Sequence, residues 1–269
     1  NQATVCFAEN KPPIREHAAH NGGSFWNVAT QEFAMTTLLT NDIPTPKTYH
    51  EAVNGPHAQE WIESTESELN SMKKKNVWRV VKATPQRPIG AKWVFRVKQD
   101  QSGRVTRFKA RIVAKGFAQR YGVDFWDTWA PVAHYTTIRS LLAFAARQDL
   151  TLRQLDADTA FLNASMTEKV YVKPPPGVKV PRGHVLLLNK CLYGCRQSSR
   201  EWWLCIDKIF KTTLKMKSSG ADPCLYYRFA NGTMIFVCLF VDDIIIASNC
   251  DKAIEEVKTG LESHFSLTG

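Results

Sequence analysis

The sequence contains no hydrophobic run long enough to cross a membrane. Its longest apolar stretch, residues 234–241, ends at two aspartates that separate it from a second short run at 244–247. Paired carboxylates of this kind are costly in hydrocarbon, which argues against a membrane span. The chain also starts without methionine and without a charged-then-apolar leader, so we expect a piece of a longer protein and not a secreted precursor.

Metal-binding cysteine patterns are absent as well. The seven cysteines form no CxxC pair and no Cys/His metal spacing, and their odd number is typical of free thiols in a reducing compartment. Internal repeats and low-complexity tracts are also missing. Hydrophobic residues make up 44% of the 269 positions and charged residues 22%, which is ordinary for a globular protein with a sizeable core. The length suits one large domain or two small ones.

Acidic residues are scarce in one part of the chain. Between positions 73 and 121 a single acid, Asp100, stands among fifteen Lys and Arg residues, in a chain whose formal net charge is +10. The same stretch contains the aromatic residues Trp78, Trp93, Phe95, Phe108 and Phe117. This pattern predicts a groove for a polyanion with aromatic support, and nucleic acid is the first candidate. A phosphorylated small molecule and a merely solvated basic face are the alternatives.

Helical and strand-like patterns follow one another without strict alternation. Residues 1–45 lack sustained periodicity and are expected to be a poorly ordered lead-in, with a short helical piece near residues 30–39. Apolar spacing predicts helices over residues 48–75, 138–147, 198–217 and 254–265. Strands are expected at residues 77–81, 92–98, 106–114 and 151–155, with turn residues 100–103 closing a hairpin. This mixture predicts an α+β fold.

Asp242 and Asp243 lie between two β-branched runs, where a hairpin turn is expected. Two adjacent carboxylates with little solvent around them repel each other, and a divalent cation is the simplest compensation. Oxygen ligands of this kind suit magnesium. The alternative is an ordinary Asp-Asp turn, which is common in hairpins.

Asp156 ends the strand predicted over residues 151–155, directly before a helix expected over residues 157–162. One acid at a strand end and a pair at a hairpin turn form the ligand set of a two-metal site. In such a site one ion activates the attacking hydroxyl and the other stabilises the leaving oxygens. The alternative role of Asp156 is a helix N-cap, which is compatible in geometry with metal ligation.

Residues 192–198 precede the helix predicted over 198–217 and contain Gly194, Arg196 and Gln197. The glycine allows the backbone to approach a base or a sugar closely. The two polar side chains can reach phosphates or base edges. The alternative is a simple helix-entry turn.

Six ordered sequence blocks resemble one known family. They read KWVFRVKQDQSGRVTRFKARIVAKGFAQ, GVDFWDTWAPV, LRQLDADTAFL, VYVKPPPGV, LYGCRQSSREWW and FVDDIIIAS. In this order and spacing, the chain from about Trp61 to Phe265 resembles the reverse transcriptase of copia-type long-terminal-repeat retrotransposons. The resemblance implies an RNA-directed DNA polymerase with a right-hand fold. Fingers and an incomplete palm would be present, while the thumb and the RNase H domain would be absent.

The resemblance also implies roles for individual residues. It places the catalytic, metal-binding aspartates of the palm at Asp156, Asp242 and Asp243. The backbone carbonyl of Ala157 would be a further metal ligand, and Phe161 would be the aromatic gate that excludes a 2′-hydroxyl. The incoming nucleotide would be contacted by Lys109, Arg111, Gly194 and Gln197. The basic residues expected to contact the nucleic acid are Lys115 and Arg196.

The expected cofactor is Mg²⁺, with Mn²⁺ as the alternative. The expected partners are deoxynucleoside triphosphates, an RNA or DNA template with a primer, and the rest of a Pol polyprotein, with integrase upstream and RNase H downstream. No membrane partner is expected, and the location would be a cytoplasmic virus-like particle or, as the alternative, the nucleus. By resemblance, residues 1–45 are a linker, 46–150 mainly fingers and 151–269 mainly palm, with fingers elements interleaved near 165–190.

The chain departs from the family pattern at a few positions. Cys195-Arg196 stands where relatives usually carry Leu-Lys, Ser199 where they carry Pro, and Ala157-Asp158-Thr159 where they carry Val-Lys-Asn. Asp158 adds an acid beside the expected metal site, although no metal ligand is lost. Because thumb and RNase H blocks are not found in the sequence, the alternative function is a catalytically inactive nucleic-acid-binding fragment, or a relic, of such an element.

Overall fold

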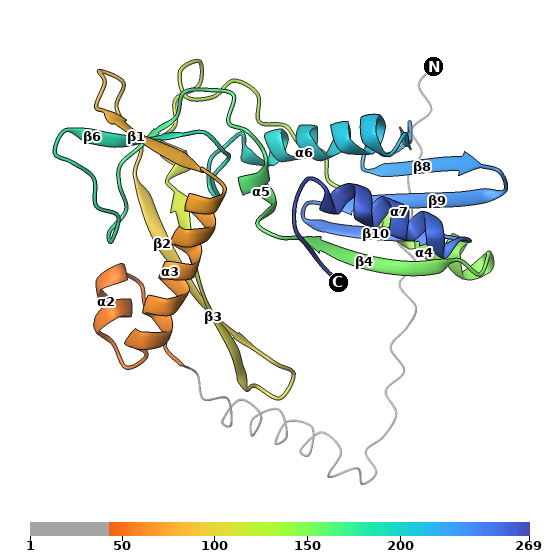
Figure 1. The fold of residues 1–269 in the computed structure, drawn as a ribbon, viewed down its shortest axis with the longest axis horizontal. Coiled ribbons are helices and arrows are strands. Elements are labelled where there is room, and N and C mark those ends of the chain that lie inside the picture. The colour runs from red at the N-terminus through yellow and green to blue at the C-terminus, as the bar shows by residue number, and fades with distance from the viewer. Residues whose placement is uncertain (1–42) are drawn as a thin grey trace, which may run out of the picture. The chain divides into compact units, whose positions relative to one another are not determined.

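The computed structural model describes residues 43–269, so the predicted helical piece at 30–39 and most of the predicted lead-in lie outside the described residues. Helices and antiparallel strands are mixed in the described part (Figure 1), as the predicted α+β class requires. Residues Pro44–Lys98 and Val105–Gly269 belong to one compact unit, and the hairpin tip Gln99–Arg104 does not. No described helix is both long enough and apolar enough to span a bilayer.

A six-stranded antiparallel sheet carries the predicted acidic residues. Its strands run in the order β11 (Leu267–Thr268), β4 (Thr151–Ala157), β10 (Asp243–Ser248), β9 (Thr233–Phe240), β8 (Leu225–Ala230) and β7 (Lys217–Ser218). Successive side chains of a strand point to opposite faces of the sheet. In β9, Ile235, Val237 and Leu239 are buried in the core. The residues that alternate with them lie on the other face.

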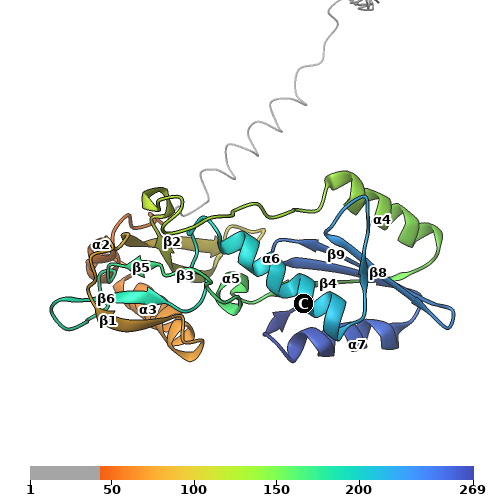
Figure 2. The same cartoon turned by 90° about the horizontal axis from the view of Figure 1, so that it is seen from above.

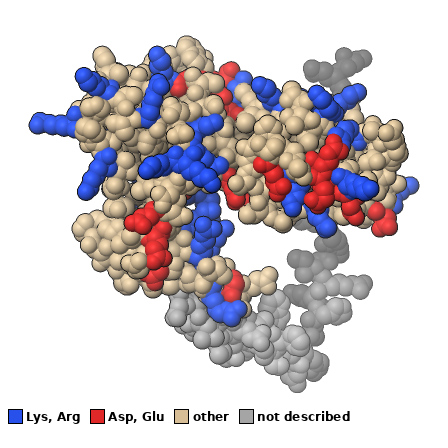
Figure 3. Space-filling model, in the orientation of Figure 1, with Lys and Arg blue, Asp and Glu red and all other residues tan. Residues whose placement is uncertain are grey.

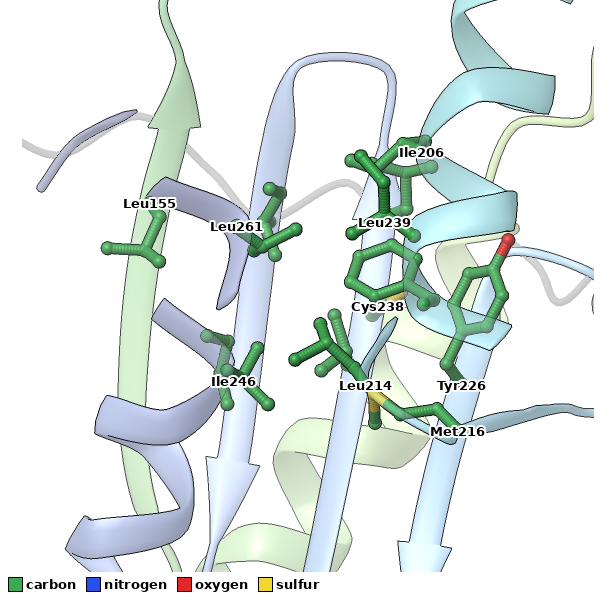
Figure 4. Close-up of a cluster of buried hydrophobic side chains, with 14 of the residues drawn as sticks. Leu155, Ile206, Leu214, Met216, Tyr226, Cys238, Leu239, Ile246 and Leu261 are labelled. Carbon is green, nitrogen blue, oxygen red and sulfur yellow. The ribbon is translucent and has the colours of Figure 1, made fainter. Parts of the chain in front are cut away.

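Two helices pack on the buried face of this sheet. They are α6 (Ser198–Lys208) and α7 (Asp251–Glu262), each with one apolar stripe that enters the core. Figure 4 shows Ile206 of α6 and Leu261 of α7 in the same cluster as the strand residue Leu239. The predicted helix at 254–265 is therefore confirmed, shifted by three residues at each end.

A second hydrophobic cluster lies beside α3 (Ala58–Lys74) and includes the buried residues Trp61 and Met72 of that helix. The strands around it are β1 (Trp78–Lys82), β2 (Ala91–Gln99), β3 (Val105–Ala114), β5 (Tyr171–Val172) and β6 (His184–Leu188). The hairpin predicted from the turn residues 100–103 is confirmed, because β2 and β3 pair with each other. A further helix, α4 (Tyr135–Arg147), lies on the opposite side of the six-stranded sheet from α7 (Figure 2).

The helix predicted over residues 48–75 is in fact two helices. α2 (Tyr49–Asn54) ends before Gly55, whose backbone is extended, and α3 begins at Ala58. Pro56 explains the break, because proline has no N–H to donate and disfavours the helical conformation of the residue before it. The predicted end of the helix near residue 75 is confirmed, with Asn76 in the left-handed region.

Two other predicted helices are shorter than expected. The helix predicted to open after Asp156 begins only at Ala160, because β4 continues to Ala157 and Thr159 adopts a left-handed conformation. Asp156 is therefore a strand residue, and its alternative role as a helix N-cap is wrong. The helix predicted over residues 198–217 ends as a regular α-helix at Lys208, where one wider helical turn follows.

Part of the predicted aromatic support is wrong as well. Trp93 and Phe95 are buried in the second cluster, where Trp93 stacks on Tyr49 and Phe95 meets Trp61 edge-on. These aromatic rings stabilise the core, because alternation along β2 turns both toward α2 and α3. Phe117, by contrast, is 79% exposed.

Candidate functional site

The pairing of two strands brings the predicted acidic residues together. β4 and β10 run antiparallel in a register that sets Asp156 directly opposite Asp243. Their chain neighbours Leu155 and Ile244 are buried in the core, so both aspartates project from the other face of the sheet. Side chains of directly opposed residues in antiparallel strands lie about 5 Å apart at their Cβ atoms. Asp242 joins them from the turn between β9 and β10.

That turn is strained and held from two sides. Val241 has φ of +60°, a conformation that is unfavourable for a β-branched residue. The Ala157 amide donates a hydrogen bond to the carbonyl of Asp242 (2.9 Å). The indole N–H of Trp202 donates to the carbonyl of Val241 (2.7 Å). Strain of this kind persists only where surrounding contacts over-determine the backbone, and such positions are concentrated in functional sites.

The electrostatics around Asp156, Asp242 and Asp243, here called the acidic corner, favour a bound cation. Partial burial raises the pKa of Asp156, and the nearby Asp242, Asp243 and Asp158 raise it further, while Lys109 acts in the opposite direction. Carboxylate and carbonyl oxygens are the ligands that Mg²⁺ prefers. The donor types therefore fit a divalent metal.

The side chains do not, as they stand, form a closed ligand set. Within residues 43–269, no group of three or more His, Cys, Asp or Glu side chains is arranged to hold a metal ion. Gln154 donates a hydrogen bond to Oδ1 of Asp243 (3.1 Å). The bond occupies only Oδ1, so the second oxygen of Asp243 remains available to a metal ion.

A cleft of about 940 Å³ borders the acidic corner. One wall carries acids from the sheet and its connections: Asp156, Asp158 and Asp242. The other wall is formed by α3, the residue after it and β3, and its basic residues Lys74, Lys75, Arg107, Lys109 and Arg111 outnumber its acids Glu60, Glu63 and Glu68. Figure 3 shows basic side chains gathered over β3, with acidic side chains of α3 beside them. The cleft thus places positive charge across from the acids, an arrangement that suits a polyphosphate held with a cation.

Lys109 and Arg111 are the predicted nucleotide contacts that line this cleft. Burial lowers the pKa of Lys109, and its positive neighbours Arg111, Lys98 and Arg107 lower it further, so an anion in the cleft would relieve their mutual repulsion. The guanidinium of Arg111 lies 5.2 Å from the ring centre of Tyr193. Tyr193 also lines the cleft, although the sequence reasoning singled out only its neighbour Gly194.

Phe161 lies next to the cleft and not in its lining. It sits in the first turn of α5 (Ala160–Asn163), half-buried against the core of the six-stranded sheet. Its ring meets Tyr193 edge-on at 5.1 Å between centroids. A ligand in the cleft would therefore meet Tyr193 first, with Phe161 behind or beside it.

The structure does not bring the other predicted contacts to the cleft. Gln197 is fully buried, where it donates hydrogen bonds to the carbonyl of Asp124 (2.9 Å) and to Glu168 (3.2 Å). Arg196 donates to the carbonyl of Gly116 (3.1 Å). Both side chains fasten the entry of α6 to the segment after β3. They can position that entry, but they have no place in the cleft wall.

Gly194 and Lys115 lie in the same junction between β3 and α6. Gly194 has φ of +86°, and a Cβ atom there would come within 2.3 Å of the Ala114 carbonyl oxygen. The glycine is thus required by close backbone packing. Lys115 is exposed, and its aliphatic stem passes over Gly90. Its ammonium group is free to meet a phosphate outside the cleft.

The close packing at Gly194 leads to a stability prediction. We expect Gly194→Ala to lower the free energy of unfolding by about 3 kcal/mol, through left-handed strain and overpacking together. Gly183→Ala is the matched control, because Gly183 also has positive φ (+77°) but has no atom within 4 Å of the added Cβ. Urea unfolding of both variants measures the difference, and equal losses would show that backbone contact at Gly194 is unimportant.

A surface of which the sequence pattern indicated only Phe117 lies between β3 and the first residue of α4. Five aromatic side chains there are largely exposed: Phe117, Tyr121, Trp126, Trp129 and Tyr135. Arg196 and Arg200 lie beside this segment, with Arg196 over the ring of Phe125 and Arg200 bonded to the Trp129 carbonyl. Exposed rings interleaved with cations are typical of surfaces on which unpaired bases stack. The density of aromatic residues between positions 117 and 135 is the sequence signal that could have revealed it.

Comparison with known proteins assigns the family. Acids at a strand end that face basic side chains across a cleft are typical of proteins that handle the phosphates of nucleotides. The family described as "Reverse transcriptase (RNA-dependent DNA polymerase)" matches residues 75–269. The chain belongs to this family, and the predicted resemblance is confirmed.

The most similar curated relatives include three plant Pol polyproteins. The chain is 34% identical over 234 residues to "Retrovirus-related Pol polyprotein from transposon TNT 1-94" of Nicotiana tabacum, covering 86% of this chain and 18% of the relative. It is 31% identical over 236 residues to the corresponding protein from transposon RE2 of Arabidopsis thaliana (86% and 16%). For transposon RE1 of the same plant it is 31% over 220 residues (80% and 15%). The chain thus spans less than a fifth of the length of these relatives.

Proposed function

We propose that this chain is the reverse transcriptase domain of a copia-type retrotransposon Pol polyprotein and that it transfers nucleotides from deoxynucleoside triphosphates to a primer 3′-hydroxyl. One observation carries the proposal. The register of β4 and β10 sets Asp156 opposite Asp243, beside a cleft whose far wall carries Lys109 and Arg111. Family membership supports the reaction, and the geometry supports its location.

The division into fingers and palm is part of this proposal. The second hydrophobic cluster draws its residues from positions 52–114 and again from 162–195, which supports fingers with a later interleaved segment. The cluster under the six-stranded sheet draws most of its residues from positions 133–265, which supports the palm. Because the relatives are more than five times longer than their matched parts, we assign integrase, thumb and RNase H to other parts of the polyprotein, in a cytoplasmic particle.

Each residue of the site has a role in the proposed reaction. Two Mg²⁺ ions, or Mn²⁺, would be held by Asp156, Asp242, Asp243 and the Ala157 carbonyl, and when bound they would activate the primer hydroxyl and stabilise the leaving oxygens. Lys109 and Arg111 would hold the triphosphate and offset the charge that develops on it. Tyr193 and Phe161 would provide the wall against which the sugar lies. Gln197 and Gly194 would act by position, through the junction they fasten.

The second candidate function is nucleic-acid binding without chemistry. It is favoured by the surface of exposed aromatic rings between positions 117 and 135, which needs no metal to bind single strands. Primer extension on an RNA template with Mg²⁺ or Mn²⁺ separates the two candidates. Extension supports the polymerase. Binding without extension, under both metals, would leave only the binding function.

The basic wall of the cleft and the exposed Lys115 outside it predict a strong dependence of binding on salt. Replacing Lys109, Arg111 and Lys115 by alanine together is expected to flatten the plot of log Kobs against log salt concentration by about one unit per lost phosphate contact, because each neutralised phosphate releases a counterion. Fluorescence anisotropy with a primer–template at several salt concentrations measures the slope.

The matched control removes the same charge elsewhere. Lys217, Lys252 and Lys258 lie outside the cleft lining, and their combined replacement by alanine is expected to leave the slope unchanged. Equal slopes for the first triple variant and the unaltered chain would place the binding groove in another part of the molecule.

A further inference from the structure

Trp202 connects α6 to the turn that carries the acidic pair. Its side chain is 1% exposed and packs edge-on against Phe265 at 5.3 Å between centroids. Its indole N–H reaches out of this apolar setting and donates to the carbonyl oxygen of Val241 at 2.7 Å. The bond joins residues 39 positions apart in the sequence. Because the ring is almost fully buried, packing determines the direction in which its N–H points.

The acceptor of this bond is the strained residue of the turn. Two-residue hairpin turns with φ > 0 at the first position normally have glycine there, whereas this chain has the β-branched Val241 with φ of +60°. A strained turn relaxes unless contacts hold it. The Trp202 bond is a contact of this kind, since it is made by the strained residue itself.

The next residue of the turn is held by a different element. The carbonyl of Asp242 accepts from the amide of Ala157, the neighbour of Asp156 in β4. Two successive carbonyls of the turn are therefore fixed, one by α6 and one by β4. A shift of the Val241 carbonyl would move Asp242 and the start of β10 with it, and would change their distance from Asp156.

We propose that Trp202 is a positioning residue, which holds the Val241–Asp242 turn and thereby keeps Asp242 and Asp243 near Asp156. The catalytic importance of this role rests on the proposed function. Trp202 touches neither substrate nor metal in this proposal; it acts through the backbone of the turn.

Its neighbour Trp203 provides the matched comparison. The indole N–H of Trp203 is buried and has no hydrogen-bond partner among residues 43–269, and its ring meets Trp129 edge-on. Removal of this N–H breaks no hydrogen bond to the turn. Trp202→Phe and Trp203→Phe are thus the same chemical change on adjacent residues of one helix.

The first readout does not depend on enzymatic activity. In Trp202→Phe, the amide of Ala157 is expected to exchange its hydrogen about three- to tenfold faster. Loss of the Trp202 bond loosens the turn, and the Asp242 carbonyl that accepts from this amide moves with the turn. Mn²⁺ binding, followed by electron paramagnetic resonance, is expected to weaken by a similar factor. Trp203→Phe is expected to change neither quantity.

The second readout is kinetic. If the chain extends primers, Trp202→Phe is expected to lower kcat about tenfold with little change in KM, as for a group that orients the reacting carboxylates. Val241→Gly should relieve the strain in the turn. Trp202→Phe is then expected to lower kcat by a smaller factor in the Val241→Gly background than in the unaltered chain. Purely additive losses in this double-mutant cycle would overturn the proposal.

Loss of packing is separated from loss of the hydrogen bond. If Trp202→Phe does not fold, 3-benzothienylalanine at position 202 keeps the shape of tryptophan and lacks only the N–H. Unchanged amide exchange at Ala157 in whichever variant folds would refute the positioning role. Absence of primer extension by the unaltered chain would instead refute the proposed function, while the exchange experiment would still decide the role of Trp202.

Discussion

Asp156→Asn is expected to lower primer extension by at least about a thousandfold. Asparagine keeps the size of the side chain opposite Asp243 but removes the negative charge that a cation requires at this position. The loss of a metal ligand that acts on the transition state is worth about 4 kcal/mol or more, which corresponds to about three orders of magnitude in rate. Single-turnover extension of a labelled primer measures the effect.

The same substitution is expected to leave the fold intact. Burial and the nearby acids raise the pKa of Asp156, so the folded chain binds a proton here more readily than the unfolded chain. The stability contributed by this group therefore falls as the pH rises through the range between the two pKa values, and a neutral asparagine should leave Tm unchanged or slightly higher at neutral pH.

Asp251→Asn is the matched control, because Asp251 is an exposed acid in the first turn of α7. It is expected to retain full activity. An Asp156→Asn variant that folds and still extends primers at more than a tenth of the original rate would contradict the catalytic assignment.

Phe161→Ala is expected to raise incorporation of ribonucleotides relative to deoxynucleotides by about 10–200-fold. An aromatic face beside the sugar collides with a 2′-hydroxyl, and steric differences of this size in a pocket are worth about 1–3 kcal/mol. The ring lies in the first turn of α5 against Tyr193, which itself lines the cleft. Primer extension with each type of nucleotide gives the ratio of kcat/KM.

The alternative is that Phe161 serves the core alone. Its removal would then cost about 3–5 kcal/mol of stability and would lower both activities equally. Phe144→Ala, on α4 and outside the cleft lining, is the control for loss of a partly exposed phenylalanine. Equal loss for both sugars in Phe161→Ala, together with a lowered Tm, would end the gate assignment.

Local patterns were sufficient to predict several elements. The apolar alternation on both sides of residues 100–103 predicts the β2–β3 hairpin, and the turn residues between them are local signals. The helix at positions 48–75 was predicted without its break, although Gly55-Pro56 is a strong breaking signal. The helix after Asp156 was expected too early, because the extension of β4 to Ala157 depends on its pairing with the distant strands β10 and β11.

Local sequence patterns were enough to predict that Asp242 and Asp243 stand between two strands, that Asp156 lies near the end of another, and that positive charge is concentrated between residues 73 and 121. These are properties of chain neighbours, which composition and periodicity reveal. Three features are visible only in the folded chain: Asp156 lies opposite Asp243, Trp93 and Gln197 are buried, and Trp202 donates to the Val241 carbonyl. The physical reason is that strand register and burial depend on packing between residues far apart in the chain, which no local pattern encodes.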